Sequence, residues 1–157
     1  MTLASCAFIG LALWVGGWGL MIGVVTPTLF RSFQKPEAGR FLEVLFPAVD
    51  RWTFVWAGVT VGALLAFFLN RHFVARSLVI EIPVGVMFLL NLHSVVILHP
   101  QIRELKRKIN LPQYQGTAHQ QTMQNAFERL HRRSVQLHGL LLFLGIFVLG
   151  LSPRFLR

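Results

Sequence analysis

The chain has 157 residues, of which 54% are hydrophobic and only 13% are charged. Soluble domains carry roughly 25% charged residues, so the composition argues against a water-soluble globular protein and predicts an integral membrane protein. The formal net charge of +9 is confined to particular loops, and this placement argues against nucleic-acid binding.

Four apolar stretches meet the length of about 20 residues that a membrane-spanning helix needs. We expect transmembrane helices at residues 3–27, 48–69, 77–99 and 130–151. No Lys or Arg precedes the first stretch and no A-x-A site follows it, so we expect the first helix to be retained rather than cleaved as a signal. The predicted fold class is all-α: a polytopic membrane four-helix bundle forming one domain over residues 1–157.

The first expected helix is rich in glycine and ends near Pro27. Gly19 and Gly23 form a G-x-x-x-G motif, which allows close approach of two helices. Packing inside the bundle is the favoured interpretation, and dimerisation is the alternative. In loop one, apolar residues at helical spacing near Phe41 predict a short amphipathic helix, after which Pro47 is expected to bend the chain.

Residues 100–129 form the one sizeable aqueous segment that the sequence predicts. Near its end, Met123, Phe127 and Leu130 follow the i, i+4, i+7 spacing of a helix face. A capping pattern at Thr117 suggests a helix start there. The fourth helix is therefore expected to be extended, projecting about three turns beyond the bilayer.

Basic residues are distributed unequally between the two sides of the expected bundle. Loops one and three hold eleven of them: Arg31, Lys35, Arg40, Arg51, Arg103, Lys106, Arg107, Lys108, Arg129, Arg132 and Arg133. The opposite side holds Arg71, Arg76, Arg154 and Arg157. The positive-inside rule then predicts a bacterial inner (plasma) membrane protein with loops one and three cytoplasmic and both termini periplasmic. Residues Arg103, Lys106, Arg107, Lys108, Arg132 and Arg133 are expected to meet lipid headgroups of the surrounding bilayer.

Polar residues inside membrane helices are the default functional candidates. The third expected helix holds Glu81, Asn91, His93 and Ser94, and the fourth holds Ser134, Gln136 and His138. Glu81 lies near the outer end of its helix, so an ion pair with Arg76 is favoured over a proton or cation site.

The histidines suggest a more specific site. The third helix descends and the fourth rises, so His93 and His138 are expected at similar depths, about 10 Å above His99 and His131. His93 and His138 are the candidate cofactor ligands, and His99 and His131 are candidate metal ligands. His93 and His99 lie 120° apart around their helix, so at most one of them should join the face that carries His138.

Several interpretations of these histidines remain open. Facing imidazoles can bind haem b, hold copper or zinc, or relay protons, whereas simple hydrogen bonding across the bundle is favoured on frequency. Tight packing between His93 and His138 would exclude haem, because helices normally lie 8–10 Å apart. Cys6 is the only cysteine, so no internal disulfide can form. No nucleotide, zinc-protease or serine-hydrolase motif is present, and no catalytic residue is assigned.

Short motifs in this chain resemble the bacterial family called domain of unknown function 4149, which is similar to eukaryotic transmembrane protein 205. The motifs are Thr26-Pro27-x-Leu29-Phe30, Ala38-Gly39, Leu45-Phe46-Pro47 and Phe127-x-x-Leu130-His131-x-x-Ser134. The resemblance implies four crossings, with Pro27, Phe30, Pro47, His131 and Ser134 as the family's marked residues. Some bacterial members are grouped with copper-export proteins. His138 departs from the family pattern, in which an amide is expected.

The sequence alone favours a non-enzymatic inner-membrane protein, an accessory or structural subunit that binds other membrane subunits or itself. The first alternative is a haem b or copper-binding protein that acts in electron transfer or metal handling. The second alternative is a small transporter with a path through Glu81, Asn91 and His93.

Overall fold

The computed structural model describes residues 3–70, 78–112 and 118–151, and every regular element in these ranges is helical. In chain order the elements are α1 (Leu3–Leu20), η1 (Met21–Val25), α2 (Thr26–Ser32), α3 (Lys35–Asn70), α4 (Leu78–His93), η2 (Ser94–Leu98), α5 (His99–Ile109) and α6 (Ala118–Leu151). The two η elements are single π-helical turns, in which hydrogen bonds join residues i and i+5.

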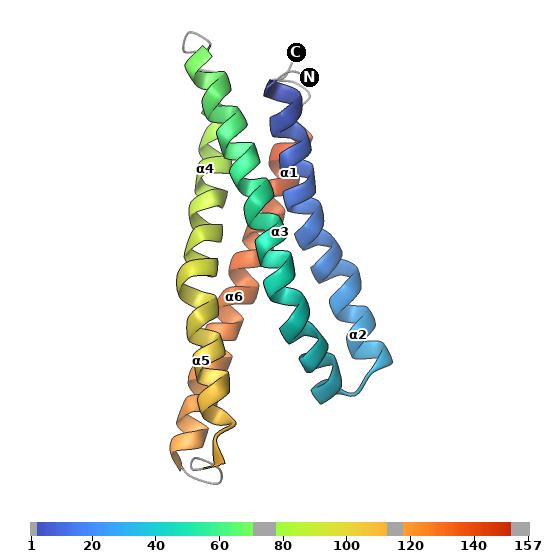
Figure 1. Ribbon diagram of the computed structural model, residues 1–157, viewed down its shortest axis with the longest axis vertical. Helices are drawn as coiled ribbons and strands as arrows, with labels where there is room; N and C mark the ends of the chain where they lie inside the picture. Colours follow the sequence, from blue (N-terminus) through green and yellow to red (C-terminus); the bar gives the residue numbers. More distant parts are fainter. Residues whose placement is uncertain (1–2, 71–77, 113–117, 152–157) are drawn as a thin grey trace.

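These elements join end to end into long rods (Figure 1), four in the described part of the chain. The rods cover Leu3–Ser32, Lys35–Leu69, Leu78–Ile109 and His119–Leu151, and each is long and apolar enough to cross a membrane. The protein is therefore an all-α, multi-pass membrane four-helix bundle, as the sequence predicts.

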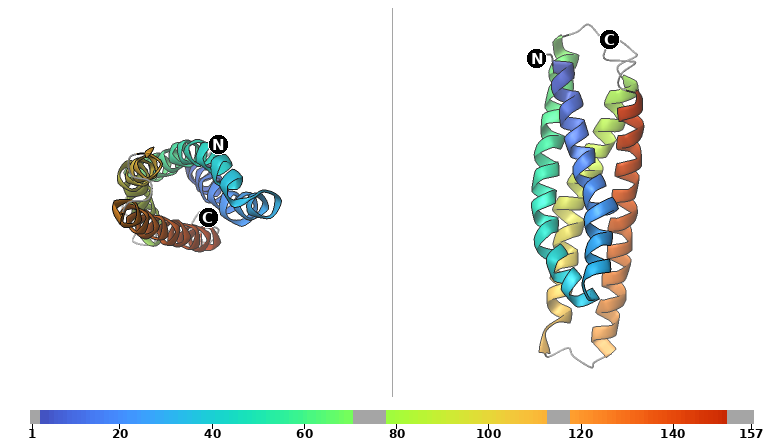
Figure 2. Two further views of the ribbon diagram at one scale, coloured as in Figure 1. Left: turned by 90° about the horizontal axis from the view of Figure 1, so that it is seen from below. Right: turned by 90° about the vertical axis from the view of Figure 1, so that its right-hand side faces the viewer.

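Successive rods run antiparallel, and the start of α1 and the end of α6 lie at the same end of the bundle (Figures 1 and 2). The α1 helix packs along α3 on one side and against α6 on the other. The α4 helix packs against both α6 and α3, and α5 packs along α6, so the four rods form a closed ring. Each rod therefore has two neighbours and one face turned away from the bundle.

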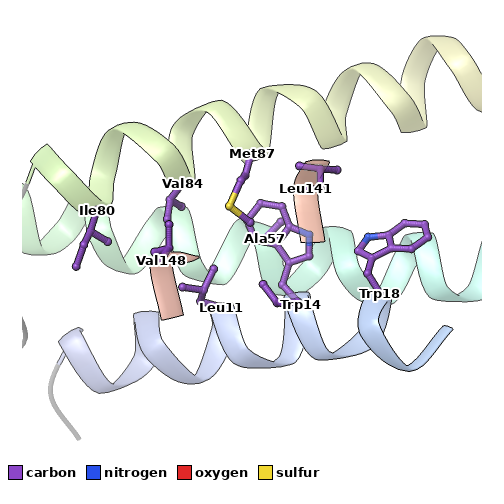
Figure 3. Close-up of a cluster of buried hydrophobic side chains, with 10 residues drawn as sticks. Leu11, Trp14, Trp18, Ala57, Ile80, Val84, Met87, Leu141 and Val148 are labelled. Atoms are coloured by element: carbon purple, nitrogen blue, oxygen red, sulfur yellow. The ribbon is translucent and has the colours of Figure 1, made fainter. Parts of the chain in front are cut away.

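The interior is filled by apolar side chains from all four rods (Figure 3). Its largest fully buried members are Trp14, Met87, Val84 and Val148. The outward faces are also apolar: Phe143, for example, is 68% exposed. Such exposure would be a liability in water, but it is what helices surrounded by hydrocarbon require.

Two glycines allow α1 to approach α3 closely. A Cβ atom at Gly10 would lie 2.7 Å from Thr60 Oγ1, and one at Gly17 would lie 3.2 Å from Thr53 Cγ2. A Cβ at Gly19 would make an ordinary contact, and one at Gly23 would meet nothing within 4 Å. The close contact is thus made by Gly10 and Gly17, two turns apart, rather than by the G-x-x-x-G pair.

The helices extend further than the expected ranges. The amphipathic segment of loop one continues without a break into the second span, and Pro47 is accommodated inside α3. The third span continues through α5 to Ile109. The α6 helix begins at Ala118, next to Thr117, which lies outside the described residues. With 34 residues, α6 is about 51 Å long, whereas the hydrocarbon core is about 30 Å thick. Figure 1 accordingly shows α5 and the start of α6 reaching beyond the α2–α3 end of the bundle.

Candidate metal centre

A cluster of three ionisable side chains lies inside the bundle, where α3, α5 and α6 meet. One donor atom from each of Asp50, His99 and His138 lies within 4.8 Å of the others. Asp50 is 6% exposed and His138 is 5% exposed, and the His99 side chain is 14% exposed. Burying such groups is costly unless they are paired, and in a membrane helix they mark functional sites by default.

The π-helical turn η2 places His99 in this cluster. On a regular α-helix, residues five positions apart point about 140° away from each other. In η2 the His99 backbone N–H instead donates to the Ser94 carbonyl oxygen, so the two side chains lie one turn apart on one face. Ser94 Oγ and His99 Nε2 are 3.2 Å apart. A sequence reading at 3.6 residues per turn could not bring these two residues together.

Asp50 holds the other ring nitrogen of His99. The His99 Nδ1–H donates to Asp50 Oδ2 at 2.7 Å, whereas the second carboxylate oxygen, Oδ1, is buried without a hydrogen-bond partner among the described residues. A second charged contact joins α3 and α5 seven residues away along each helix. There, Lys106 Nζ donates to Glu43 Oε2 at 2.6 Å. Seven residues correspond to about 10 Å, so α3 and α5 are joined by two charged contacts at that spacing.

His138 uses one of its two ring nitrogens in hydrogen bonds. Its Nδ1–H donates to the Ser134 carbonyl oxygen at 2.7 Å, which leaves the lone pair on Nε2. That nitrogen is buried and unpartnered within the described part of the chain. The His138 ring lies between Trp18, with ring centroids 4.0 Å apart, and His99, with centroids 5.4 Å apart and planes within 11°.

Two further polar side chains near the cluster are unsatisfied. Asn91 is fully buried on the interior face of α4, one turn before Ser94. Among residues 3–70, 78–112 and 118–151, neither its Nδ2 nor its Oδ1 has a partner, and the same holds for Trp18 Nε1. Leaving a buried donor or acceptor unpaired costs about 1–3 kcal/mol. This part of the interior therefore offers more polar atoms than it satisfies.

The donor set suits a metal ion better than it suits haem or covalent catalysis. Two imidazoles and one carboxylate are the ligands of many zinc enzymes and of non-haem Fe(II) sites. The rings of His99 and His138 stack face to face, with centroids 5.4 Å apart, whereas the two axial imidazoles of a haem lie end to end on opposite sides of the iron. Ser94, His99 and Asp50 follow the order of a serine-hydrolase triad, but the complete burial of Ser94 keeps it from a substrate ester in this arrangement.

Residues 9–110 match the model of a family described as Domain of unknown function (DUF4149). The chain belongs to this family. The match confirms the resemblance to this family, and it runs from within α1 to the end of α5, so it includes Asp50, Ser94 and His99. His138 lies beyond it, in α6. The motif Phe127-x-x-Leu130-His131-x-x-Ser134 also lies outside the match. Comparison with curated proteins and with solved structures gave no match.

In the structure, His138 lies beside a different histidine from the one expected from the sequence. His99, rather than His93, lies beside His138, whereas His93 is exposed on α4. His131 is exposed on α6 and stacks on Phe127, with ring centroids 5.9 Å apart. The expectation from depth alone paired His93 with His138; in the structure, the rotation at η2 and the packing of α5 against α6 bring His99 there.

The other residues expected to matter lie at the bundle surface or in its interior. Of those expected from the family resemblance, Ser134 is buried, Pro27 and Pro47 are half-buried, and Phe30 and His131 are exposed. Glu81 is half-buried with Oε1 unpartnered among the described residues, and its expected partner Arg76 lies outside them, as do Arg71, Arg154 and Arg157. Gln136 is exposed. Arg103, Arg107, Lys108, Arg132 and Arg133 are exposed near the α5–α6 end, where Lys108 pairs with Glu104 at 2.7 Å.

Two residues of the site were not singled out in the sequence. Asp50 falls inside the second expected helix and is the one acidic residue there. An intramembrane carboxylate is a signal by itself, and it could have been paired with the histidines on that ground. Trp18 gave no such signal, because an indole in an apolar helix is ordinarily a packing residue.

Proposed function

We propose that this membrane protein binds one divalent transition-metal ion at Asp50, His99 and His138. The observation that carries the proposal is the hydrogen-bond arrangement around the two imidazoles. An ion would take the place of the proton between Asp50 and His99 Nδ1, this proton would move to His99 Nε2, and His138 would bind through its free Nε2. His99 Nε2–H would then donate to Ser94 Oγ, just as His138 Nδ1–H donates to the Ser134 carbonyl oxygen. Metal-binding histidines almost always donate their second N–H in this way.

The ligand types limit the metals that fit. Nitrogen and carboxylate donors suit Zn²⁺, Fe²⁺ and Cu²⁺, whereas Cu⁺ prefers sulfur ligands, and none of the three donors is sulfur. In a tetrahedral site with bonds of about 2.0–2.1 Å, neighbouring donors lie about 3.4 Å apart. The donor atoms already lie within 4.8 Å of one another, so binding would shorten the longest of these separations by about 1.4 Å at most. The Asp50 Oδ2 and His99 Nδ1 atoms, now 2.7 Å apart, would instead move apart to about 3.4 Å. The proposed role is metal handling or metal-based electron transfer in the membrane.

The chain offers matched controls for a test, because it has histidines inside and outside the cluster. We expect detergent-purified protein grown with added metal to retain about one ion per chain, measured by elemental analysis. His99→Gln and His138→Gln should each lose it, whereas His93→Gln and His131→Gln should keep it. Equal metal content in all five proteins would overturn the proposal, as would its absence from the parent protein after direct Zn²⁺ titration.

An absorption spectrum distinguishes a bound haem from the bare metal ion that we propose. A site that holds a bare ion gives no Soret band. A Soret band that disappears in His138→Gln would show instead that the two helices part to admit a haem.

A second candidate function is that of an accessory or structural subunit, and one observation on α3 favours it. Gly58 and Gly62 form a G-x-x-x-G pair on the exposed face of α3, where an added Cβ would meet nothing within 4 Å. Val59, between them, is 40% exposed. Motifs of this kind allow another transmembrane helix to pack closely, either from a further copy or from another subunit.

Association through this face is tested by the size of the purified particle. Gly58→Ile and Gly62→Ile should reduce crosslinking in membranes and the recovery of any stoichiometric partner. Gly16→Ile is the control, because Gly16 is also exposed and unobstructed but lies on α1. Identical particle sizes for all three variants and the parent would remove this candidate.

We further propose that the protein resides in the bacterial inner membrane, with both termini periplasmic. The support is the charge asymmetry: Arg103, Lys106, Arg107, Lys108, Arg132 and Arg133 gather at the α5–α6 end of the bundle, which would then face the cytoplasm and its anionic lipid headgroups.

A further inference from the structure

The charge of the proposed centre does not balance with protein ligands alone. A divalent ion bound by one carboxylate and two neutral imidazoles carries a net charge of +1. Asp50 and His138 are 6% and 5% exposed, and an uncompensated charge is costly in such surroundings. The three protein donors also leave a tetrahedral ion with an open position, as in catalytic rather than structural zinc sites.

The unsatisfied polar atoms beside the cluster show what could occupy that position. Asn91 Nδ2 and Trp18 Nε1 are buried N–H donors without partners among the described residues. Trp18 contacts the ring of His138, and Asn91 lies one turn from Ser94, which hydrogen-bonds His99. N–H donors beside a cation are suited to a ligand that is a hydrogen-bond acceptor and negatively charged.

We propose that the bound ion takes a small external monoanion as its fourth ligand, with Asn91 and Trp18 donating hydrogen bonds to it. Hydroxide, a halide or a small carboxylate has the required charge and size. The inference rests on the metal site proposed above. It makes the centre an open, ligand-exchanging site rather than a closed structural one.

Azide and Co²⁺ are suitable probes for this test. Co²⁺ replaces Zn²⁺ in such sites, and its visible absorption bands report the coordination number and ligands. The parent protein loaded with Co²⁺ should change its spectrum on addition of azide, with a saturable dependence on azide concentration. Asn91→Leu and Trp18→Phe should each weaken azide binding about tenfold, the effect of losing one hydrogen bond to a charged group. Both should bind Co²⁺ within about threefold of the parent.

A third variant distinguishes ligand recognition from a merely structural role. Asn91→Asp would place a second carboxylate near the ion and neutralise it, so Co²⁺ should still bind while the azide response disappears. A variant that only disturbs packing would lose both. Helix content and elution volume of each variant identify misfolded protein, and Trp18→Phe retains an aromatic ring at this position while removing the N–H donor.

The outcomes separate this inference from the proposed function. If Co²⁺ does not bind the parent protein, both are overturned. If Co²⁺ binds but azide leaves the spectrum unchanged, the external anion is overturned and the metal site stands. If azide binds equally well to the parent, Asn91→Leu and Trp18→Phe, the assignment of these two donors is wrong.

Discussion

The absence of a side chain at Gly10 allows α1 and α3 to lie close together. An added Cβ would lie 2.7 Å from Thr60 Oγ1 and 3.3 Å from the Thr60 backbone nitrogen. The hydroxyl cannot simply turn away without loss, because it donates to the Trp56 carbonyl oxygen at 2.7 Å. Any side chain at this position must therefore push the two helices apart.

We predict that Gly10→Ala destabilises the bundle by about 1–3 kcal/mol, the usual cost of overpacking a tight contact. The measurement is thermal or denaturant-induced unfolding in detergent. Gly16→Ala is the control on the same helix, because its added methyl group meets nothing within 4 Å, and it should be neutral or slightly stabilising. A Gly10→Ala variant as stable as Gly16→Ala would contradict the close contact.

Residue chemistry alone identified some members of the site. His138, Asn91 and Ser94 stand out in the sequence because polar side chains are costly in hydrocarbon, and the structure buries all three. Counting residues along ideal helices could not tell His93 from His99, because the answer depends on a local change of helical pitch. His93 lies in regular α4, whereas His99 follows the π-turn.

The η2 turn is the element on which the cluster depends. It carries one residue more than an α-helical turn, and it brings His99 onto the face of Ser94. π-turns of this type are frequent at functional sites, and η1 begins three residues after Trp18 in the first rod.

We predict that inserting one alanine after Val96 abolishes metal retention, because it turns His99 by about 100° relative to Ser94. Deleting Val96 should preserve metal retention, since the turn becomes α-helical and the histidine then lies four residues after Ser94, still on the same face. Elemental analysis of both purified variants is the measurement. Equal metal content after insertion and deletion would show that η2 does not position the ligand.

The two charged contacts between α3 and α5 should differ in strength. The Lys106 and Glu43 side chains are 39% and 54% exposed, whereas those of His99 and Asp50 are 14% and 8% exposed. Exposed ion pairs contribute roughly 0–1 kcal/mol, but removal of the acceptor for a buried donor costs about 1–3 kcal/mol.

Lys106→Met should therefore change the free energy of unfolding by less than about 1 kcal/mol, and Asp50→Ala should cost about 2 kcal/mol or more. Unfolding of the metal-free variants in detergent gives both numbers. A larger effect at Lys106 than at Asp50 would mean that the exposed contact, rather than the buried one, holds the two helices together.

At the scale of the whole molecule, the number of membrane crossings could be predicted from the apolar composition of the sequence. Apolar runs of sufficient length identify spans whatever their packing, and the four spans and the all-α bundle agree with that expectation. The ends of the helices could not be predicted from composition, because hydropathy falls where the bilayer stops, whereas the backbone hydrogen bonds of the helix continue beyond it. For this reason α3 begins at Lys35 and α5 ends at Ile109, well outside the apolar runs.

The orientation predicted from charge can be tested with single cysteines in a Cys6→Ser background. Leu3→Cys and Leu111→Cys are suitable because both side chains are exposed, at 39% and 37%, near opposite ends of the bundle. A membrane-impermeant maleimide should label the cysteine at position 3 in cells whose outer membrane is permeable. Labelling at position 111 should require disruption of the inner membrane as well. The reverse pattern would invert the topology.

The seven-residue spacing of the Asp50–His99 and Glu43–Lys106 contacts restricts how this bundle can move. A piston-like slide of α3 past α5 would break both contacts at once. A pivot about Asp50 and His99 would break only the outer, solvent-accessible one. An opening that admits an ion from the α5–α6 end should therefore be a rotation of α3 relative to α5 about the buried Asp50–His99 contact, which separates the two helices at the Glu43–Lys106 end.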